Sequence, residues 1–434
     1  MSPDNKQILA SQIKVKIDGT ELKQDVMDDL KFVQVDQHVL LPAMFTLTFL
    51  LKPDLKLLDG SQFDLGKEIE ILSLDPDRNN QAVSLMKGEI TAIEPSFGDG
   101  MIAELTLRGF DKSHRLFRET KSKSWLNVKD SDIASKVAGT AGLSAQVDAT
   151  SQVFEHIFQH NQTDMEFLMQ RAWRIGYECF VQEGKLYFRK PPTSGSGSTL
   201  TWGNELTSFY PRLSTAEQVS EVEVRGWDGL QKKDIKGNAS SSQTNPQIGF
   251  GKWGGEAAQK AFGKGKLILV DQPVVSKADA DKLAQARLDE LNGAFVEADG
   301  ECFRSPEVTA GKIVELKGLG KRFSGKYLLT NVKHTYNVER GFITIFHVRG
   351  TRTGLLVEQM LHEAPTDRWP AAVPAIVTNN DDPKKLGRVK VKFPWLDPLQ
   401  ESNWARVASA GAGKQRGMNV IPEVNDEVLV TFLF

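Results

Sequence analysis

Two histidines, His156 and His160, stand at the spacing with which metalloprotease helices bind zinc. Position 157 is isoleucine, whereas that motif places its catalytic glutamate directly after the first histidine. The flanking residues favour a strand ending at Gln162, on which the two imidazoles would lie about 13 Å apart, too far to share a metal ion. We therefore expect ordinary surface or core histidines and no metal site.

Residues 320–327, GKRFSGKY, nearly match a phosphate-binding loop. Tyr327 replaces the serine or threonine that would hold magnesium, and the next residues favour a strand, although the loop needs a helix there. We expect a hairpin turn and no nucleotide cofactor. Cys179 and Cys302 match no nucleophile signature and are predicted to be buried free thiols. The sequence thus predicts no catalytic residue and no cofactor, although a distant pair of carboxylates stays open.

The composition is that of an ordinary soluble protein. The chain has 434 residues, 40% of them hydrophobic and 25% charged, with a net charge of −2. This length allows about three domains. A near-neutral chain makes nucleic acid an unexpected partner. No stretch reaches the ~18 consecutive apolar residues of a membrane span, and the N-terminus has no secretory signal, so we expect synthesis in the cytosol and no stable membrane insertion.

The elements that must position any functional residue are mostly strands. The first hundred residues alternate short apolar runs with turn residues, which predicts antiparallel β structure. Ser131 is predicted to cap a short helix, and Thr163 with Glu166 forms a capping box before a second one. Residues 276–292 give the strongest helix signal. The Gly/Ser/Asn-rich residues 229–255 are predicted to be a long loop.

The last segment is again β. Arg388, Lys390 and Lys392 alternate with apolar residues, which predicts a strand with one buried face and one basic face. This face, together with Lys384 and Lys385, could meet an acidic partner, although a solvated strand face is the simpler interpretation. The sequence stops at Phe434 within a predicted strand, so we expect the natural product to continue or to carry a further part.

Several motifs, in this order, resemble the VgrG-like spike and hub proteins of contractile injection systems, which include type VI secretion spikes, phage baseplate hubs and extracellular phage-tail-like particles. The most specific are residues 376–395, 401–407 and 422–430, which are similar to the OB-fold domain beneath the needle of that family. Asn425 stands where the family usually has glycine, and asparagine is the next-best residue for a positive φ. Supporting motifs are residues 107–116, 162–168, 184–189 and 224–228.

The resemblance implies a mainly β fold with α/β insertions, in which two hub β-barrel domains are followed by an OB-fold barrel. The expected division is 1–110 for the first hub barrel, 111–215 for an α/β insertion, 216–350 for the second hub barrel with helix 276–292, 351–374 for a connector, and 375–434 for an incomplete OB-fold domain. The needle that the family carries after this domain is absent from the sequence.

The resemblance also implies a structural, non-enzymatic role. Three copies would cap the inner tail tube, match six similar barrels to a six-fold tube, and help to pierce the target envelope when the sheath contracts. The expected partners are two further copies, the inner tube protein, other baseplate proteins, a PAAR-like tip protein and effector cargo. The assembled particle or secretion apparatus would deliver the protein outside the producing cell.

The resemblance also places contacts between protomers at hub strand faces and at the basic OB strand. This strand would flank the three-fold axis, where its charges must be hydrated or paired with acids such as Asp381 and Asp382. The predicted interface residues are Val314, Leu316, Leu328, Val332, Arg388, Lys390, Lys392, Trp395 and Trp404. Two alternatives stay open: a hub that cleaves peptidoglycan through carboxylates of the insertion, and a carbohydrate-binding OB module with exposed aromatic residues near Trp395 and Trp404.

Overall fold

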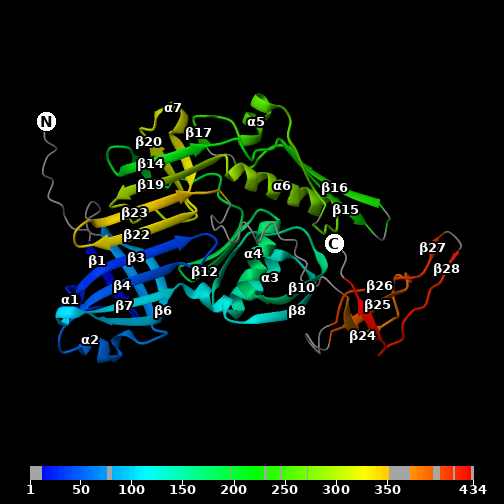
Figure 1. The fold of residues 1–434 in the computed structure, drawn as a ribbon, viewed down its shortest axis with the longest axis horizontal. Helices are drawn as coiled ribbons and strands as arrows, with labels where there is room; N and C mark the ends of the chain where they lie inside the picture. The colour runs from blue at the N-terminus through cyan, green and yellow to red at the C-terminus, as the bar shows by residue number, and fades with distance from the viewer. Residues whose placement is uncertain are drawn as a thin grey trace.

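The computed structural model is mainly β, as predicted, with the short helices α1 (Gln24–Met27) and α2 (Lys56–Asp59) near the N-terminus and the longer helices between residues 130 and 293 (Figure 1). It describes residues 12–75, 81–195, 197–228, 231, 233–244, 247–270, 272–350, 372–393, 401–413 and 416–431. The predicted connector lies mostly outside these residues. None of the helices in the described ranges has both the length and the apolar character needed to cross a membrane.

One sheet of eleven strands runs through both hub segments, in the order β14-β19-β23-β22-β3-β4-β7-β6-β5-β1-β2. Its strands are β1 (Gln12–Ile17), β2 (Thr20–Glu21), β3 (Leu30–His38), β4 (Met44–Leu51), β5 (Glu68–Asp75), β6 (Gln81–Phe97), β7 (Ala103–Phe110), β14 (Leu206–Leu213), β19 (Val296–Phe303), β22 (Asn331–Asn337) and β23 (Gly341–Val348). Strand β22 pairs with β3 over seven residues, so the early and late strands form one continuous layer. Strand β14 belongs to this sheet, although the predicted boundary at residue 215 leaves it in the insertion.

The sheet has one buried and one polar face, as alternating sequences require. On β4 the side chains of Phe45, Leu47 and Phe49 are completely buried. On the opposite face Thr48 and Thr106 of β7 are hydrogen-bonded across the strands at 3.1 Å. This alternation fixes the register, because a shift by one residue would expose the phenylalanines.

The insertion contains two helices packed against short sheets. Its elements are η4 (Lys112–Phe117), β8 (Thr120–Val128), α3 (Asp130–Thr140), β9 (Ser144–Val147), β10 (Phe154–Thr163), α4 (Asp164–Arg174), β11 (Glu178–Gln182) and β12 (Lys185–Arg189). The capping box before α4 is confirmed: Thr163 Oγ1 accepts from the Glu166 amide, and the Glu166 carboxylate accepts from the Thr163 amide. The predicted Ser131 cap is wrong. Helix α3 starts at Asp130, two residues earlier than a Ser131 cap would place it, because the Asp132 carboxylate accepts from the Lys129 amide. Ser131 instead forms hydrogen bonds with Thr150.

The second hub segment adds two small sheets and the longest helix. Its elements are β13 (Thr199–Thr201), β15 (Glu221–Asp228), β16 (Lys233–Ala239), β17 (Gln247–Ile248), α5 (Gly254–Phe262), β18 (Lys266–Leu269), α6 (Lys277–Gly293), β20 (Ile313–Lys317), α7 (Gly320–Phe323) and β21 (Gly325–Leu328). Helix α6 confirms the predicted helix, with Ser276 accepting from the Asp279 amide at 3.1 Å. The turn α7, followed by strand β21, confirms that residues 320–327 are not followed by a helix.

The predicted long loop at residues 229–255 is wrong, because β16 and β17 lie within it. Strand β16 packs on α6, and a Cβ at Gly237 would lie 2.2 Å from the Ala280 carbonyl carbon. The glycine that looks like a loop residue is therefore what lets the strand approach the helix.

The C-terminal segment forms a separate four-stranded sheet in the order β26-β25-β24-β29. Its strands are β24 (Val373–Asn379), β25 (Arg388–Lys392), β26 (Ala405–Arg406) and β29 (Glu427–Val430), with a small hairpin of β27 (Ala412–Gly413) and β28 (Arg416–Gly417). Their apolar residues form a core of their own. Asn425 has a φ of 77°, as expected for a residue in the place of glycine.

Replacing Thr163 with alanine should reduce the local stability of α4 by about 1 kcal/mol, because the Glu166 amide loses its acceptor. Hydrogen exchange of the α4 amides measures this change directly. Thr140→Ala at the exposed end of α3 is the control and should shift local stability by no more than roughly 0.5 kcal/mol. Equal effects of the two variants would contradict the role assigned to the cap.

Candidate functional site: polar joints and interface residues

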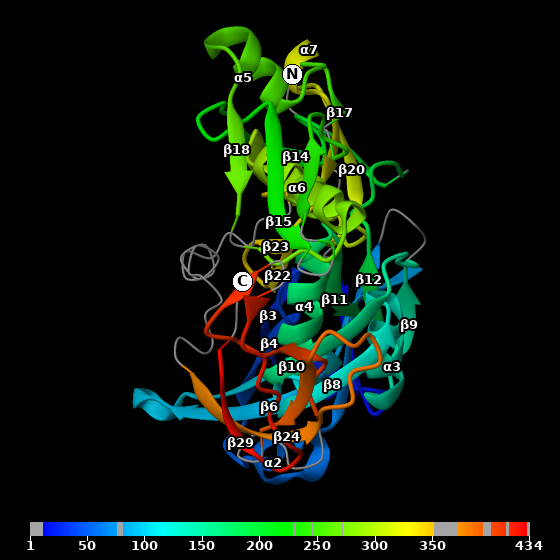
Figure 2. The same ribbon diagram turned by 90° about the vertical axis from the view of Figure 1, so that its right-hand side faces the viewer.

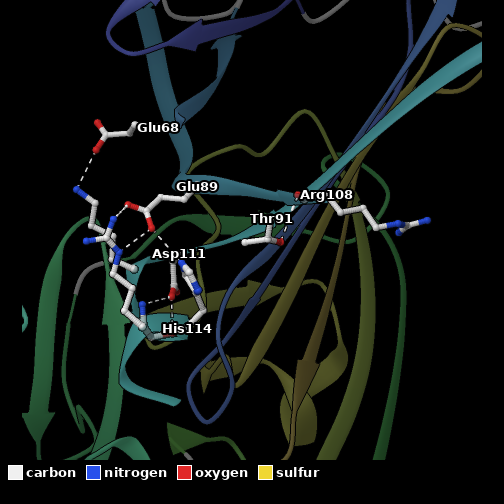
Figure 3. Close-up of polar contacts among 9 residues, drawn as sticks. Glu68, Glu89, Thr91, Arg108, Asp111 and His114 are labelled. Atoms are coloured by element: carbon white, nitrogen blue, oxygen red, sulfur yellow. Dashed lines mark hydrogen bonds and ion pairs between the residues drawn. The ribbon is translucent and has the colours of Figure 1, made fainter. Parts of the chain in front are cut away.

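A cluster of charged and polar side chains joins the first hub strands to the insertion (Figure 3). Asp111, directly after β7, accepts hydrogen bonds from the Ser113 amide at 2.8 Å, the Ser113 hydroxyl and the Ala43 amide at 2.9 Å. It therefore caps the short helix η4 and ties it to the loop before β4. We call this group, with Glu89, His114 and Arg115, the Asp111 joint.

Glu89 of β6 anchors the other side of the joint. Its carboxylate accepts from Arg115 through two nitrogens, at 2.8 and 2.6 Å, and lies 2.9 Å from His114 Nε2. Burial acts to raise the pKa of Glu89, but the hydrogen bonds from His114 and Arg115 outweigh it, and the pKa lies below its usual value. At Asp111 burial dominates and raises the pKa to about 6 despite its three hydrogen bonds.

Gly109 explains why the motif at residues 107–116 has its form. A Cβ there would lie 2.0 Å from the Glu89 carbonyl oxygen and 2.5 Å from the Phe45 ring. Only glycine permits this approach of β7 to β6. The Asp-x-Ser spacing could have identified Asp111 as a cap, but no local signal links Glu89 to residues 25 positions later.

The basic strand β25 is paired within its own domain. Arg388 and Asp382 are both buried and form a two-pronged ion pair, at 3.0 and 2.7 Å. The hydrogen bond from Arg388 comes first among the effects that hold the pKa of Asp382 well below its usual range. Lys390 pairs with Glu401, and Trp404 lies under both cations, 5.9 Å from the Arg388 guanidinium carbon and 5.6 Å from Lys390 Nζ.

Three predicted interface residues are core residues of this chain. Val314, Leu316 and Val332 are at most 1% exposed and belong to the cluster that also contains the insertion helices. Within this single chain, its own layers cover their side chains. Leu328 and Lys392 are half-buried, and Trp395 lies outside the described residues.

The described residues contain no group of three histidine, cysteine, aspartate or glutamate side chains that could hold a metal ion. His156 and His160 lie on β10 with Phe158 stacked between them, at ring-centroid distances of 6.2 and 5.8 Å. Cys179 and Cys302 are buried free thiols, as predicted, and burial raises the pKa of each, to about 12 for Cys302.

Two family profiles match nearly the whole chain. The Alg8 N-terminal domain matches residues 7–337, and the type VI secretion system/phage-baseplate injector OB domain matches residues 373–433. The chain belongs to the Alg8 N-terminal domain family, and its C-terminal part is similar to the OB domain of type VI secretion and phage-baseplate proteins. The resemblance expected from the motifs is thereby confirmed, and the OB profile starts at the first strand of the C-terminal sheet.

Curated relatives agree with this family. The spike protein VgrG1b of Pseudomonas aeruginosa is 23% identical over 393 residues, which cover 80% of this chain and 49% of that protein. VgrG3 of Vibrio cholerae is 52% identical over 53 residues, which cover 11% of this chain and 5% of that protein. The chain thus spans at most about half the length of these relatives.

Solved structures share the fold. The 43 kDa tail protein of prophage MuSo2 from Shewanella oneidensis has a TM-score of 0.59 at 15% identity, covering 78% of this chain and 98% of its own. An E. coli type VI secretion component, described as similar to the T4 tail proteins gp27 and gp5, has a TM-score of 0.56 at 15% identity, covering 88% and 89%. A chain of a Francisella PdpA–VgrG complex has a TM-score of 0.54 at 8% identity, with 97% of this chain and 76% of that chain covered.

Substitution of Asp111 should weaken the joint. Asp111→Ala leaves the Ala43 and Ser113 amides without this acceptor, at a cost of about 1–3 kcal/mol for each group that stays unpaired. Hydrogen exchange of residues 43 and 113–118 measures the loss. Asp99→Ala, at an exposed turn where Asp99 accepts only the Gly100 amide, is the control and should change little.

The joint should also depend on pH. The folded carboxyl of Asp111 binds a proton below about pH 6, whereas the unfolded one does so only near 3.8. The stability of the wild-type chain relative to Asp111→Asn should therefore rise as the pH falls from 7 to 4. A constant difference across this range would contradict the raised pKa.

Proposed function

We propose that the chain is a structural hub of a contractile injection machine: three copies cap the inner tail tube, adapt a three-fold spike to a six-fold tube, and help to pierce the target envelope. The observation that carries this proposal is the order of parts. Two hub segments joined in one eleven-stranded sheet precede an OB domain, in a chain that resembles the VgrG-like family.

The two edges of the sheet could join copies of the chain into a closed ring. It ends in β14 on one side and in the β1–β2 hairpin on the other, so each chain has two different sheet edges. Contacts between unlike edges close into a ring when the rotation per copy is right. This supports protomer contacts at the sheet edges in place of the core side chains Val314, Leu316 and Val332.

The buried carboxyls support a non-catalytic role. Asp111 holds backbone amides, and Glu178, whose pKa burial raises to about 7, lies 3.4 Å from Arg189 Nε. Asp289 lines a cavity of about 80 Å³ beside β21, but its carboxylate accepts from Ser242 Oγ and the Gln243 amide, each at 2.7 Å. Each of these acids is used in holding the fold.

The proposed partners are the inner tube protein, other baseplate proteins, a PAAR-like tip and effector cargo. The Francisella VgrG structure contains PdpA, which supports a hub that holds further proteins.

The purified chain should have a solution mass near three times 48.2 kDa by light scattering coupled to size exclusion. Tyr210→Asp, at a 71% exposed position on edge strand β14, should lower the trimer fraction because it places a charge in the contact. Trp227→Asp, at a 60% exposed position on β15 outside this sheet, is the matched control. A monomer that also fails to bind tube protein would overturn the hub proposal.

Incubation of the chain with purified peptidoglycan should release no soluble fragments above the level of buffer alone. Release that disappears in Glu178→Gln, while the variant keeps the wild-type circular dichroism spectrum, would instead favour the peptidoglycan-cleaving alternative.

A further inference from the structure

The OB domain lies beside one face of the β8–β10 sheet, on which Leu126 stays 59% exposed. Ile157 and its partner Trp125 point into the core, so the cross-strand pairs His156–Leu126 and Phe158–Ser124 lie on the opposite face. Both ribbon views place the OB strands beside β8 and β10 (Figures 1 and 2). We call this face of β8 and β10 the OB platform.

The contacts across the platform are polar. His156 Nε2 lies 3.1 Å from Ser124 Oγ, and the Ser124 hydroxyl donates to the Glu401 carbonyl oxygen at 3.3 Å. Since the hydroxyl proton is used there, the histidine donates to the serine. Lys384 Nζ lies 3.7 Å from Glu155 Oε1. A relay of hydrogen bonds and one long ion pair thus connect the OB domain to the platform.

No apolar core is shared between the two parts within the described residues. The OB cluster consists of Ala375, Val377, Val389, Val391 and Phe393, and the large cluster that contains the insertion includes none of them. An OB domain with a closed core and a polar contact can separate from its neighbour without exposing core residues.

The charges around His156 make this contact sensitive to protons. From the OB domain, the charge of Lys390 acts on His156, Glu401 reaches it through Ser124, and Lys384 pairs with Glu155 next to it. Glu155 and His160 flank His156 on β10, and β8 contributes Ser124 and Leu126 to the same face. The acids are already paired, Glu155 with Lys384, Asp382 with Arg388 and Glu401 with Lys390. A protonated imidazole would therefore add a positive charge beside Lys390, where these three acids already have cationic partners.

We propose that the platform is an acid-releasable docking site for the OB domain, in which His156 acts as the proton-sensitive element and Ser124 as the hydrogen-bonding link to Glu401. This docking site concerns the folded chain alone, so its failure would leave the hub proposal unaffected. Failure of the hub proposal would likewise leave the docking site unaffected.

The direction of the effect follows from the environment of His156. Burial, and then the charge of Lys390, lower its pKa below the ordinary 6.5 while the domain is docked. Release removes the charge of Lys390 and part of the burial, so the pKa of the imidazole rises toward its ordinary value. Docking is therefore strongest above pH 6.5 and weakens as the pH falls below it. The equilibrium constant for release of the OB domain rises by up to about tenfold per pH unit, until the pH reaches the lowered pKa of the docked histidine.

Hydrogen exchange of the full chain at pH 7.5 and 5.5, corrected for intrinsic rates, tests this. The wild type should lose protection at residues 124–126, 156–158 and 401–403 on acidification. His156→Gln keeps a donor for Ser124 but cannot become charged, so it should keep its protection. His160→Gln, on the same face of β10, is the control and should behave as the wild type.

Lys390→Gln provides a second test, because removing its charge should shift release to lower pH, whereas Lys392→Gln on the same strand should leave the midpoint unchanged. If His156→Gln and the wild type respond to pH equally, or if acidification leaves the wild-type protection unchanged, the proposal is wrong.

Discussion

The pairing of β22 with β3 is the contact on which the rest of the architecture depends. Seven residue pairs join strands that are about 300 positions apart in the chain, so the early and late strands become one sheet. The segments between them that lie outside the sheet, including the insertion and helix α6, must therefore leave the sheet and return to it. Such a contact costs loop-closure entropy before it is formed. The apolar side chains that the two strands bury supply the compensating free energy. Val35 and Val332, which sit in this pair of strands, are completely buried.

Polar side chains at strand ends attach the insertion to the sheet, and glycines let neighbouring backbones pack closely. The Asp111 joint follows β7 at the point where the sheet gives way to the insertion, and Gly109 lets β7 approach β6. Gly237 serves the same purpose between β16 and α6. Directed hydrogen bonds at such places define the angle between elements, which apolar packing alone leaves looser.

The OB domain is attached differently, through contacts that water could replace. Its core is complete without the hub, and Asp382 neutralises Arg388 inside the domain. Within the described residues, its contacts with β8 and β10 include the hydrogen bond from Ser124 to the Glu401 carbonyl oxygen and the Glu155–Lys384 pair.

The sequence by itself determined the β-rich class, the helices capped by Thr163 and Ser276, the turn at Asn425 and the family, because these depend on local patterns and on contiguous motifs. Tertiary structure alone decided where the strands go. Strand β16 lies in a Gly/Ser/Asn-rich stretch that looks like a loop until α6 packs against Gly237. Val314, Leu316 and Val332 look like surface strand residues until a second layer buries them. Glu89 and His156 likewise gain their roles from residues brought close by long-range pairing. Alternation shows which side chains share a face, but only the assembled layers determine what covers that face.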